Sequence, residues 1–201
     1  MTGKILLSTA YLPPVEYFAR ITEAEEALIE REENYIKQTF RNRCYILSSN
    51  GTHILTVPVY LGSFHKTPVK DIRIDYSRRW QQVHTGALKT AYSTSPFFIF
   101  YYEEIEKIIL TRHDFLLDLN MELLLAIMKM MNIEQYVSYS NEFQPVNYLT
   151  GDARYNITPK KRSSYIPKVY TRVFDYPEQN TGKLSILDLL FNTGPEAVRY
   201  L

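Results

Sequence analysis

Residues 4–30 read KILLSTAYLPPVEYFARITEAEEALIE, and this stretch decides the fold. The apolar run at residues 4–7 predicts a buried strand, and Pro13-Pro14 predicts a stiff turn after it. The apolar side chains that follow have the spacing of one helix face, and the run at residues 26–30 predicts a second buried strand. We therefore expect a βαβ-like unit, with a crevice for a ligand at the carboxyl ends of its strands.

Two β-rich runs, residues 44–48 and 52–57, flank the dipeptide Asn50-Gly51. This dipeptide supplies the positive φ angles of a tight turn, so the runs are expected to pair as an antiparallel hairpin. Residues 71–75 alternate polar and apolar side chains, which predicts a half-exposed strand at an edge.

The middle of the chain is predicted to be helical. Apolar side chains at helical spacing span residues 80–92 and include the position of His84. Ser95-Pro96 offers an N-cap and a first-turn proline for the next helix, and a third helix is expected at about residues 120–131.

Residues 135–139 and 168–174 are predicted to be strands, separated by a long loop of the kind that often carries function. Ser185 and Asp188 resemble a capping box that begins a short last helix. The whole chain, residues 1–201, is thus expected to be one mixed α/β domain. It has an N-terminal βαβ-like unit and hairpin, a helical middle, and C-terminal strands and a short helix.

Charge and composition argue against several classes of protein. Lysine and arginine (23) nearly balance aspartate and glutamate (22), so the chain lacks the positive field that nucleic acids attract. The lone Cys44 excludes an intramolecular disulfide and a cysteine-rich zinc site. No apolar run approaches the roughly 20 residues of a membrane-spanning helix, and the N-terminus lacks a secretory signal. We expect a soluble, cytoplasmic protein without a nucleic-acid partner.

Common catalytic and nucleotide-binding motifs are absent from the sequence. There is no GxGxxG, no GxxxxGK followed by Ser or Thr, no GxSxG and no HExxH, and the four histidines stand apart. Serine-hydrolase and zinc-peptidase chemistry therefore find no support. No metal site is predicted, and the cofactor is undefined.

Three groups of residues are candidates for a site. His84 lies on an apolar helix face and is a candidate general acid or base, although the pattern alone favours a hydrogen-bonded core histidine. Residues 35–43, YIKQTFRNR, concentrate three cations, which suits an anionic small molecule such as a nucleotide sugar or a carboxylate. A solvated approach to the hairpin is the alternative. Residues 151–155, GDARY, are either a turn or a site loop that carries an acid and a cation.

Read together, these stretches resemble the WbqC-like family over nearly the whole chain, through their order and spacing rather than through one motif. The residues that carry the resemblance are Tyr11-Leu12-Pro13 with Tyr17-Phe18, Asn42-Arg43, residues 55–59 (LTVPV), Trp80 with His84, Ala91-Tyr92 with Pro96, Leu119-Asn120, residues 151–155, and residues 184–192 (LSILDLLFN). The family is named from O-antigen gene clusters, so the resemblance implies bacterial work on precursors of surface polysaccharide.

The chain departs from the family at its opening motif. The family usually has His-Gln-Pro before Tyr-Leu-Pro and Trp-x-Gly-Tyr-Phe around it, whereas this chain has Leu7-Ser8-Thr9-Ala10 and Pro14-Val15-Glu16-Tyr17-Phe18. If the missing histidine is the catalytic group of the family, this member is altered in activity or only binds.

The leading hypothesis is a transferase-type enzyme that acts on a sugar or an activated small-molecule precursor. His84 or Asp152 is the predicted general base. The predicted substrate-binding residues are Tyr11, Lys37, Asn42, Arg43, Arg154 and Tyr155. The alternative is a noncatalytic binding or scaffold protein, which is favoured if these residues do not converge in one pocket. A nucleotidylyltransferase of the HxGH type shares the strand, loop and helix opening, but its histidines are missing here.

Overall fold

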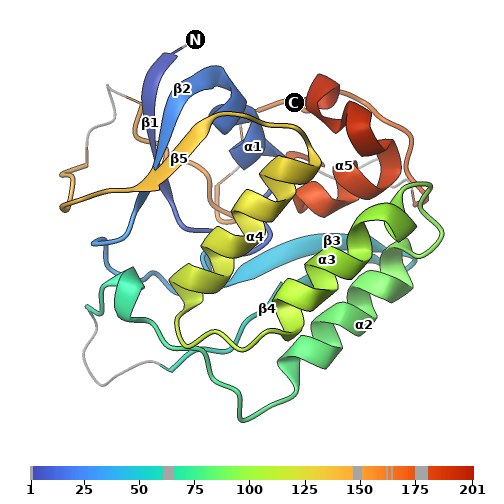
Figure 1. Cartoon of the computed structure of the whole chain (residues 1–201), viewed down its shortest axis with the longest axis horizontal. Coiled ribbons are helices and arrows are strands. Elements are labelled where there is room, and N and C mark those ends of the chain that lie inside the picture. The colour runs from blue at the N-terminus through green and yellow to red at the C-terminus, as the bar shows by residue number, and fades with distance from the viewer. Residues whose placement is uncertain (1, 61–65, 147–150, 162, 164, 175–180) are drawn as a thin grey trace.

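The computed structural model describes residues 2–60, 66–146, 151–161, 163, 165–174 and 181–201. A parallel sheet of three strands lies at one end of the molecule (Figure 1). In spatial order the strands are β1 (Thr2–Ser8), β2 (Ala24–Glu30) and β5 (Tyr136–Tyr139), and helix α1 (Val15–Glu23) connects the first two. The mixed α/β class and the βαβ-like unit are confirmed.

The two faces of this sheet have different surroundings, because side chains alternate along each strand. Ile29 of β2 is buried on one face, where it lines a small gap with Tyr17 of α1 and Leu124 of helix α4 (Leu116–Met130). Both helices therefore cover this face. The opposite face carries the register pairs Lys4 with Glu26, Leu6 with Leu28, and Ser8 with Glu30.

The predicted hairpin is present. Ser48 pairs with Gly51, so Ser49 and Asn50 make the turn, and Gly51 takes the positive φ of 94°. The turn thus lies one residue earlier than the Asn50-Gly51 dipeptide indicates. Its two antiparallel strands are β3 (Arg43–Ser48) and β4 (Gly51–Thr56).

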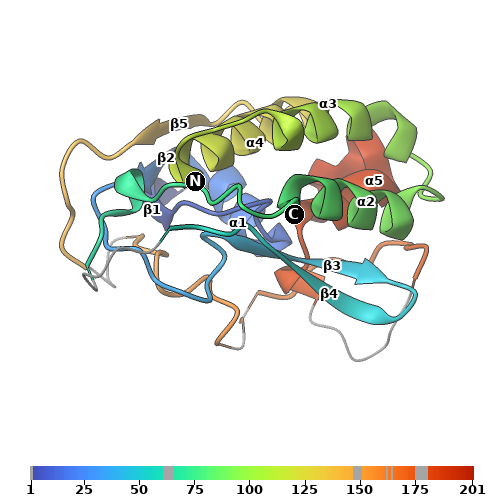
Figure 2. The same ribbon diagram turned by 90° about the horizontal axis from the view of Figure 1, so that it is seen from below.

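Three helices form the predicted helical middle: α2 (Trp80–Tyr92), α3 (Phe98–Leu110) and α4. Figure 2 shows α3 and α4 on one side of the molecule and the β3–β4 hairpin on the other. Two details differ from expectation. Val83 of α2 is 61% exposed although it fits the apolar spacing, and α3 begins at Phe98, after Ser95-Pro96 rather than on it. None of the described helices is long and apolar enough to cross a membrane.

The edge strand expected at residues 71–75 does not form. A 3-10 turn, η1 (Val69–Asp71), covers its start, and Arg73 and Ile74 then form single bridges to different segments of the chain. The apolar positions of the alternation are buried as predicted. The prediction of a strand is wrong because the backbone changes partner after one residue.

The strand expected at residues 168–174 is also absent from the described structure. Val169 is 91% exposed, whereas Tyr170 is buried and its hydroxyl donates a 2.6 Å hydrogen bond to Asp188. Buried and exposed side chains therefore alternate here because Tyr170 anchors the segment to Asp188. Within the described residues the segment does not pair with a neighbouring strand, so the prediction of a strand is wrong.

The C-terminus contains the predicted short helix, α5 (Ile186–Thr193), between two 3-10 segments, η2 (Thr181–Lys183) and η3 (Gly194–Tyr200). Ser185 caps α5, because its hydroxyl oxygen accepts a hydrogen bond from the Leu187 amide. The second half of the capping box is wrong, since the carboxylate of Asp188 accepts from Tyr170 instead.

Gly194, which ends α5, is expected to tolerate no side chain. It has φ of 58°, and an added Cβ would lie 2.4 Å from the ring of Phe97. Gly194→Ala should therefore lower the free energy of unfolding by more than about 2 kcal/mol, measured by urea denaturation.

The matched control is Gly86→Ala in the middle of α2. Gly86 has no positive φ, and its added Cβ meets nothing within 4 Å. This substitution should raise the free energy of unfolding by about 0.5–1 kcal/mol, because alanine favours a helix over glycine. Equal effects at both positions would contradict the packing described for Gly194.

Candidate functional site

The candidate site is built where residues 151–154 join the parallel sheet. The Leu6 amide donates to the Gly151 carbonyl (3.1 Å), and the Ala153 amide donates to the Leu6 carbonyl (2.9 Å). Gly151 makes this approach possible, because it has φ of 75° and a Cβ there would lie 2.7 Å from the Lys4 carbonyl oxygen. The loop predicted from the sequence therefore runs beside β1, with Asp152 opposite Leu6.

Arg154 forms the first of two buried ion-pair networks. Its Nε and Nη2 donate to the two carboxylate oxygens of Asp152 at 3.0 and 2.6 Å, and its Nη1 donates to Glu30 at 3.2 Å. Arg154 is only 2% exposed. Glu30 is fully buried at the end of β2, and it also accepts hydrogen bonds from Ser140 and from the Gln144 amide. The guanidinium is thus fixed by two carboxylates.

Arg41 forms the second network, which is also buried. Its Nε and Nη2 donate to the two carboxylate oxygens of Glu33 at 3.0 and 2.7 Å, and Nη2 also donates to the Ser8 hydroxyl at 2.7 Å. Ser8 ends β1, and Glu33 follows β2 by three residues. Both networks therefore gather at the carboxyl ends of the strands, the place where open α/β sheets bind ligands.

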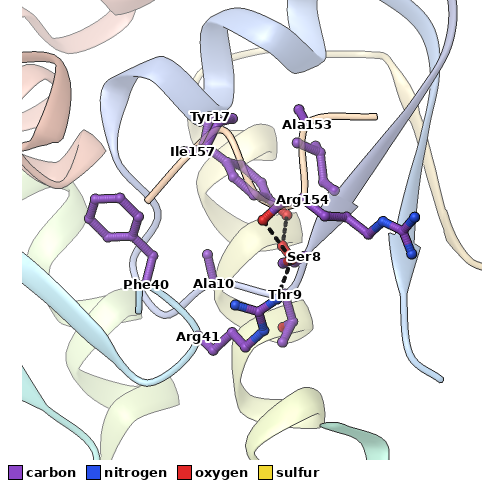
Figure 3. Close-up of a pocket in the computed structure, with 10 residues that line it drawn as sticks. Ser8, Thr9, Ala10, Tyr17, Phe40, Arg41, Ala153, Arg154 and Ile157 are labelled. Atoms are coloured by element: carbon purple, nitrogen blue, oxygen red, sulfur yellow. Dashed lines mark hydrogen bonds between the residues drawn. The ribbon is translucent and has the colours of Figure 1, made fainter. Parts of the chain in front are cut away.

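Ser8 connects the two networks (Figure 3). Its hydroxyl accepts from Arg41 and donates to the Arg154 carbonyl at 3.2 Å, while its own carbonyl accepts from the Tyr17 hydroxyl at 2.9 Å. The figure shows the Arg154 guanidinium directed away from Ser8. These groups surround a cavity of about 10 Å³, which is room for about one water molecule.

A larger pocket of about 470 Å³ lies on the sheet face that α1 and α4 leave open. Its volume is within the range of small-molecule sites. Asp152 and Gln144 stand at its edge near the ion-pair networks. The described residues that line it are Lys4, Ile5, Leu6, Leu28, Gln144, Pro145, Val146 and Asp152.

His84, the other predicted base, lies in an aromatic cluster rather than in this pocket. Its Nδ1 is 2.9 Å from the Tyr11 hydroxyl, and its ring lies edge-on to Trp80 at 5.1 Å between centroids. Burial lowers the pKa of His84 to about 4, against a smaller upward effect of the Thr56 backbone. The imidazole is therefore neutral at pH 7, and the structure joins His84 to Tyr11 but not to Asp152.

The cations predicted to bind an anion are separated. Lys37 is exposed, and Arg43 is half-buried on β3. Asn42 is buried, and its side-chain amide donates to the Val57 carbonyl at 2.9 Å, which fixes it to the chain after β4. Asp152, Arg154 and Tyr155 do lie together, and the Tyr155 ring is 5.7 Å from the Arg154 guanidinium. The structure therefore brings together Asp152, Arg154 and Tyr155, and separately Tyr11 and His84, rather than gathering all the predicted residues in one pocket.

Sequence reasoning missed Ser8, Glu30 and Glu33. A signal for Glu30 exists, because a carboxylate that directly follows the apolar run at residues 27–29 of a buried strand needs a partner. Spacing alone does not indicate that partner, since Arg154 lies 124 residues away. No group of three or more His, Cys, Asp or Glu residues suited to a metal ion occurs in the described parts of the chain.

The motifs that carry the family resemblance are also packed against one another. The Ile186 amide donates to the Pro13 carbonyl at 2.8 Å, and the Val15 amide donates to the Leu184 carbonyl at 3.0 Å. Leu12, which precedes Pro13, is buried with φ of 42°, a strained backbone for a bulky residue. The Tyr-Leu-Pro loop and the start of α5 thus form one unit, although they are about 170 residues apart.

A mixed α/β protein with a polar cluster at the carboxyl edge of a small parallel sheet is the class that these observations define. The chain belongs to the WbqC-like protein family, whose model matches residues 9–167. It is 30% identical to an uncharacterised protein of Mycobacterium tuberculosis, Rv1507c, in a match that covers 98% of this chain and 96% of that protein. A comparison with solved structures finds no match.

Proposed function

We propose that this chain is a transferase-type enzyme that binds a sugar or an activated small-molecule precursor of surface polysaccharide. The observation that carries the proposal is the pocket of about 470 Å³ that ends at Asp152, on an open face of the parallel sheet. Pockets of this size beside the carboxyl ends of parallel strands are the usual ligand sites of α/β proteins. The family resemblance supplies the link to polysaccharide precursors.

In this proposal Asp152 is the general base for a substrate hydroxyl or amine. Its carboxylate accepts hydrogen bonds from the Arg154 amide, Nε and Nη2, which hold it in place at the pocket. His84 is the second candidate base, in its separate aromatic cluster.

A specific observation favours the alternative, a noncatalytic binding or scaffold protein. The predicted residues do not converge, and the charged groups at the carboxyl edge bind one another, Arg41 with Glu33 and Arg154 with both Asp152 and Glu30. A closed network of this kind also explains these residues as structural. The two functions share the pocket, and they differ in whether bound ligand is converted.

Thermal-shift measurements across nucleotide sugars, nucleoside triphosphates, acyl-CoA thioesters, amino acids and simple carboxylates test the proposal. A ligand at 100 times its dissociation constant adds about 2.7 kcal/mol, which raises the melting temperature of a chain of this size by about 5–10 °C. We expect one class alone to do so. No shift with any class would overturn the proposed small-molecule site.

Variants then separate the enzyme from the scaffold. Asp152→Asn is expected to keep the ligand-dependent shift and to lose conversion of the ligand, followed by chromatography of the products. His84→Gln in the same assay tests the second candidate base. If the wild-type protein binds the ligand but does not convert it with any acceptor sugar, the noncatalytic binding or scaffold protein is favoured.

A further inference from the structure

The chemistry of the 470 Å³ pocket indicates which part of a substrate it takes. Parallel sheets are usually covered on both faces, yet here the described residues leave the second face partly uncovered at Leu6 and Leu28, which are half-buried. Pro145 and Val146 form an exposed apolar wall above them. The centre of the pocket is therefore hydrocarbon, and water that covers it is released when an apolar group binds.

The charged side chains that line the pocket already have partners. Lys4 pairs with Glu26 at 2.7 Å, and Asp152 pairs with Arg154 at 2.6 Å. The third Arg154 nitrogen is held by Glu30. A diphosphate needs several cations or free backbone amides, and the described lining residues offer it one exposed, already paired lysine.

We propose that this pocket holds the hydrocarbon part of an acyl group, laid over Leu6 and Leu28. This inference rests on the proposed function, because it names the substrate class of the same pocket. The acyl compound is then the activated precursor, and its reactive carbonyl points toward the end of the pocket at Asp152. A hydroxyl or amine of the sugar attacks this carbonyl carbon from that end and loses its proton to Asp152, while the C–S bond of the thioester breaks and the thiol leaves with a proton.

Chain length is the variable that tests this class of ligand. Uncharged N-acetylcysteamine thioesters of acetate, butyrate, hexanoate and octanoate differ only in their CH2 groups. Each CH2 that enters the pocket is expected to tighten binding about fourfold. The dissociation constant, measured by isothermal titration calorimetry, should therefore fall steadily along the series until the pocket is full.

Variants locate the binding surface. Leu28→Asn replaces half of the pocket floor by an amide and should weaken octanoyl binding at least tenfold while flattening the dependence on chain length. Val146→Asn, at an exposed loop position, alters the wall of the pocket and leaves the sheet unchanged. It should weaken octanoyl binding severalfold. Leu125→Asn on α4 is the control for the exposed position, because Leu125 and Val146 are similarly exposed (47% and 41%) and Leu125 lies outside this pocket.

Three outcomes decide between the possibilities. The inference is supported if the dissociation constant falls with chain length, if both pocket variants reduce this dependence, and if the Leu125→Asn control retains it. Tight binding of UDP-glucose with no dependence on chain length overturns the inference but leaves the proposed small-molecule site standing. Binding of neither kind of compound overturns the inference, and the proposed small-molecule site falls with it if no other class of the thermal-shift panel binds either.

Discussion

Arg154→Met is expected to lower the free energy of unfolding by about 3–5 kcal/mol, the usual effect of removing one partner from a buried ion pair. Methionine keeps most of the length of the side chain but removes the charge. The carboxylates of Asp152 and Glu30, which Arg154 contacts at 2.6 and 3.2 Å, would then be buried without their cation. Urea unfolding followed by circular dichroism measures the change.

Arg199→Ala provides the matched control. Arg199 also pairs with a carboxylate, Glu196 at 2.8 Å, but both side chains are exposed. Its removal should change the free energy of unfolding by no more than about 0.5 kcal/mol. A loss below about 1 kcal/mol in Arg154→Met would contradict the buried network at the carboxyl edge.

Acid is expected to destabilise the protein through His84. Its pKa is about 4 in the folded state, because burial opposes the charged form, and 6.5 is the ordinary value that applies once the chain unfolds. Between these two values the unfolded chain binds the additional proton, so stability falls as the pH falls. The resulting loss of unfolding free energy is nearly complete at pH 4 and amounts to about 3 kcal/mol.

The His84→Gln variant should lack this acid-dependent loss of stability. The control, Gln82→Ala, lies at an exposed position on the same helix and should retain the loss. The difference in unfolding free energy between wild type and His84→Gln should narrow by about 3 kcal/mol from pH 7.5 to pH 4. A constant difference over that interval would show that His84 is not buried as a neutral imidazole.

Local patterns predicted the elements whose partners are near in sequence. The βαβ-like unit needs only the spacing within residues 4–30, and the hairpin needs only the turn at Gly51. The predictions failed where pairing depends on distant segments. Ile74 bridges Val59 and Arg73 bridges Phe115, and alternation within residues 71–75 carries no information about either partner.

The site was predicted in part for the same reason. Asp152 and Arg154 are two residues apart, so their sequence already placed an acid beside a cation, and the structure joins them. Arg41 was noted as one of several cations, but its buried pair with Glu33 follows from the fold of the loop after β2. His84 was placed correctly on a buried helix face, and only tertiary packing revealed Tyr11 as its partner.

The most direct test of the proposed site is to map amide chemical shifts in ¹⁵N-labelled protein as the ligand selected by thermal shift is titrated. The account predicts that the largest changes occur at Lys4, Leu6, Leu28 and Asp152, around the pocket on the open sheet face. Changes centred on Trp80 and His84, or on the groove between α3 and α4, would contradict it.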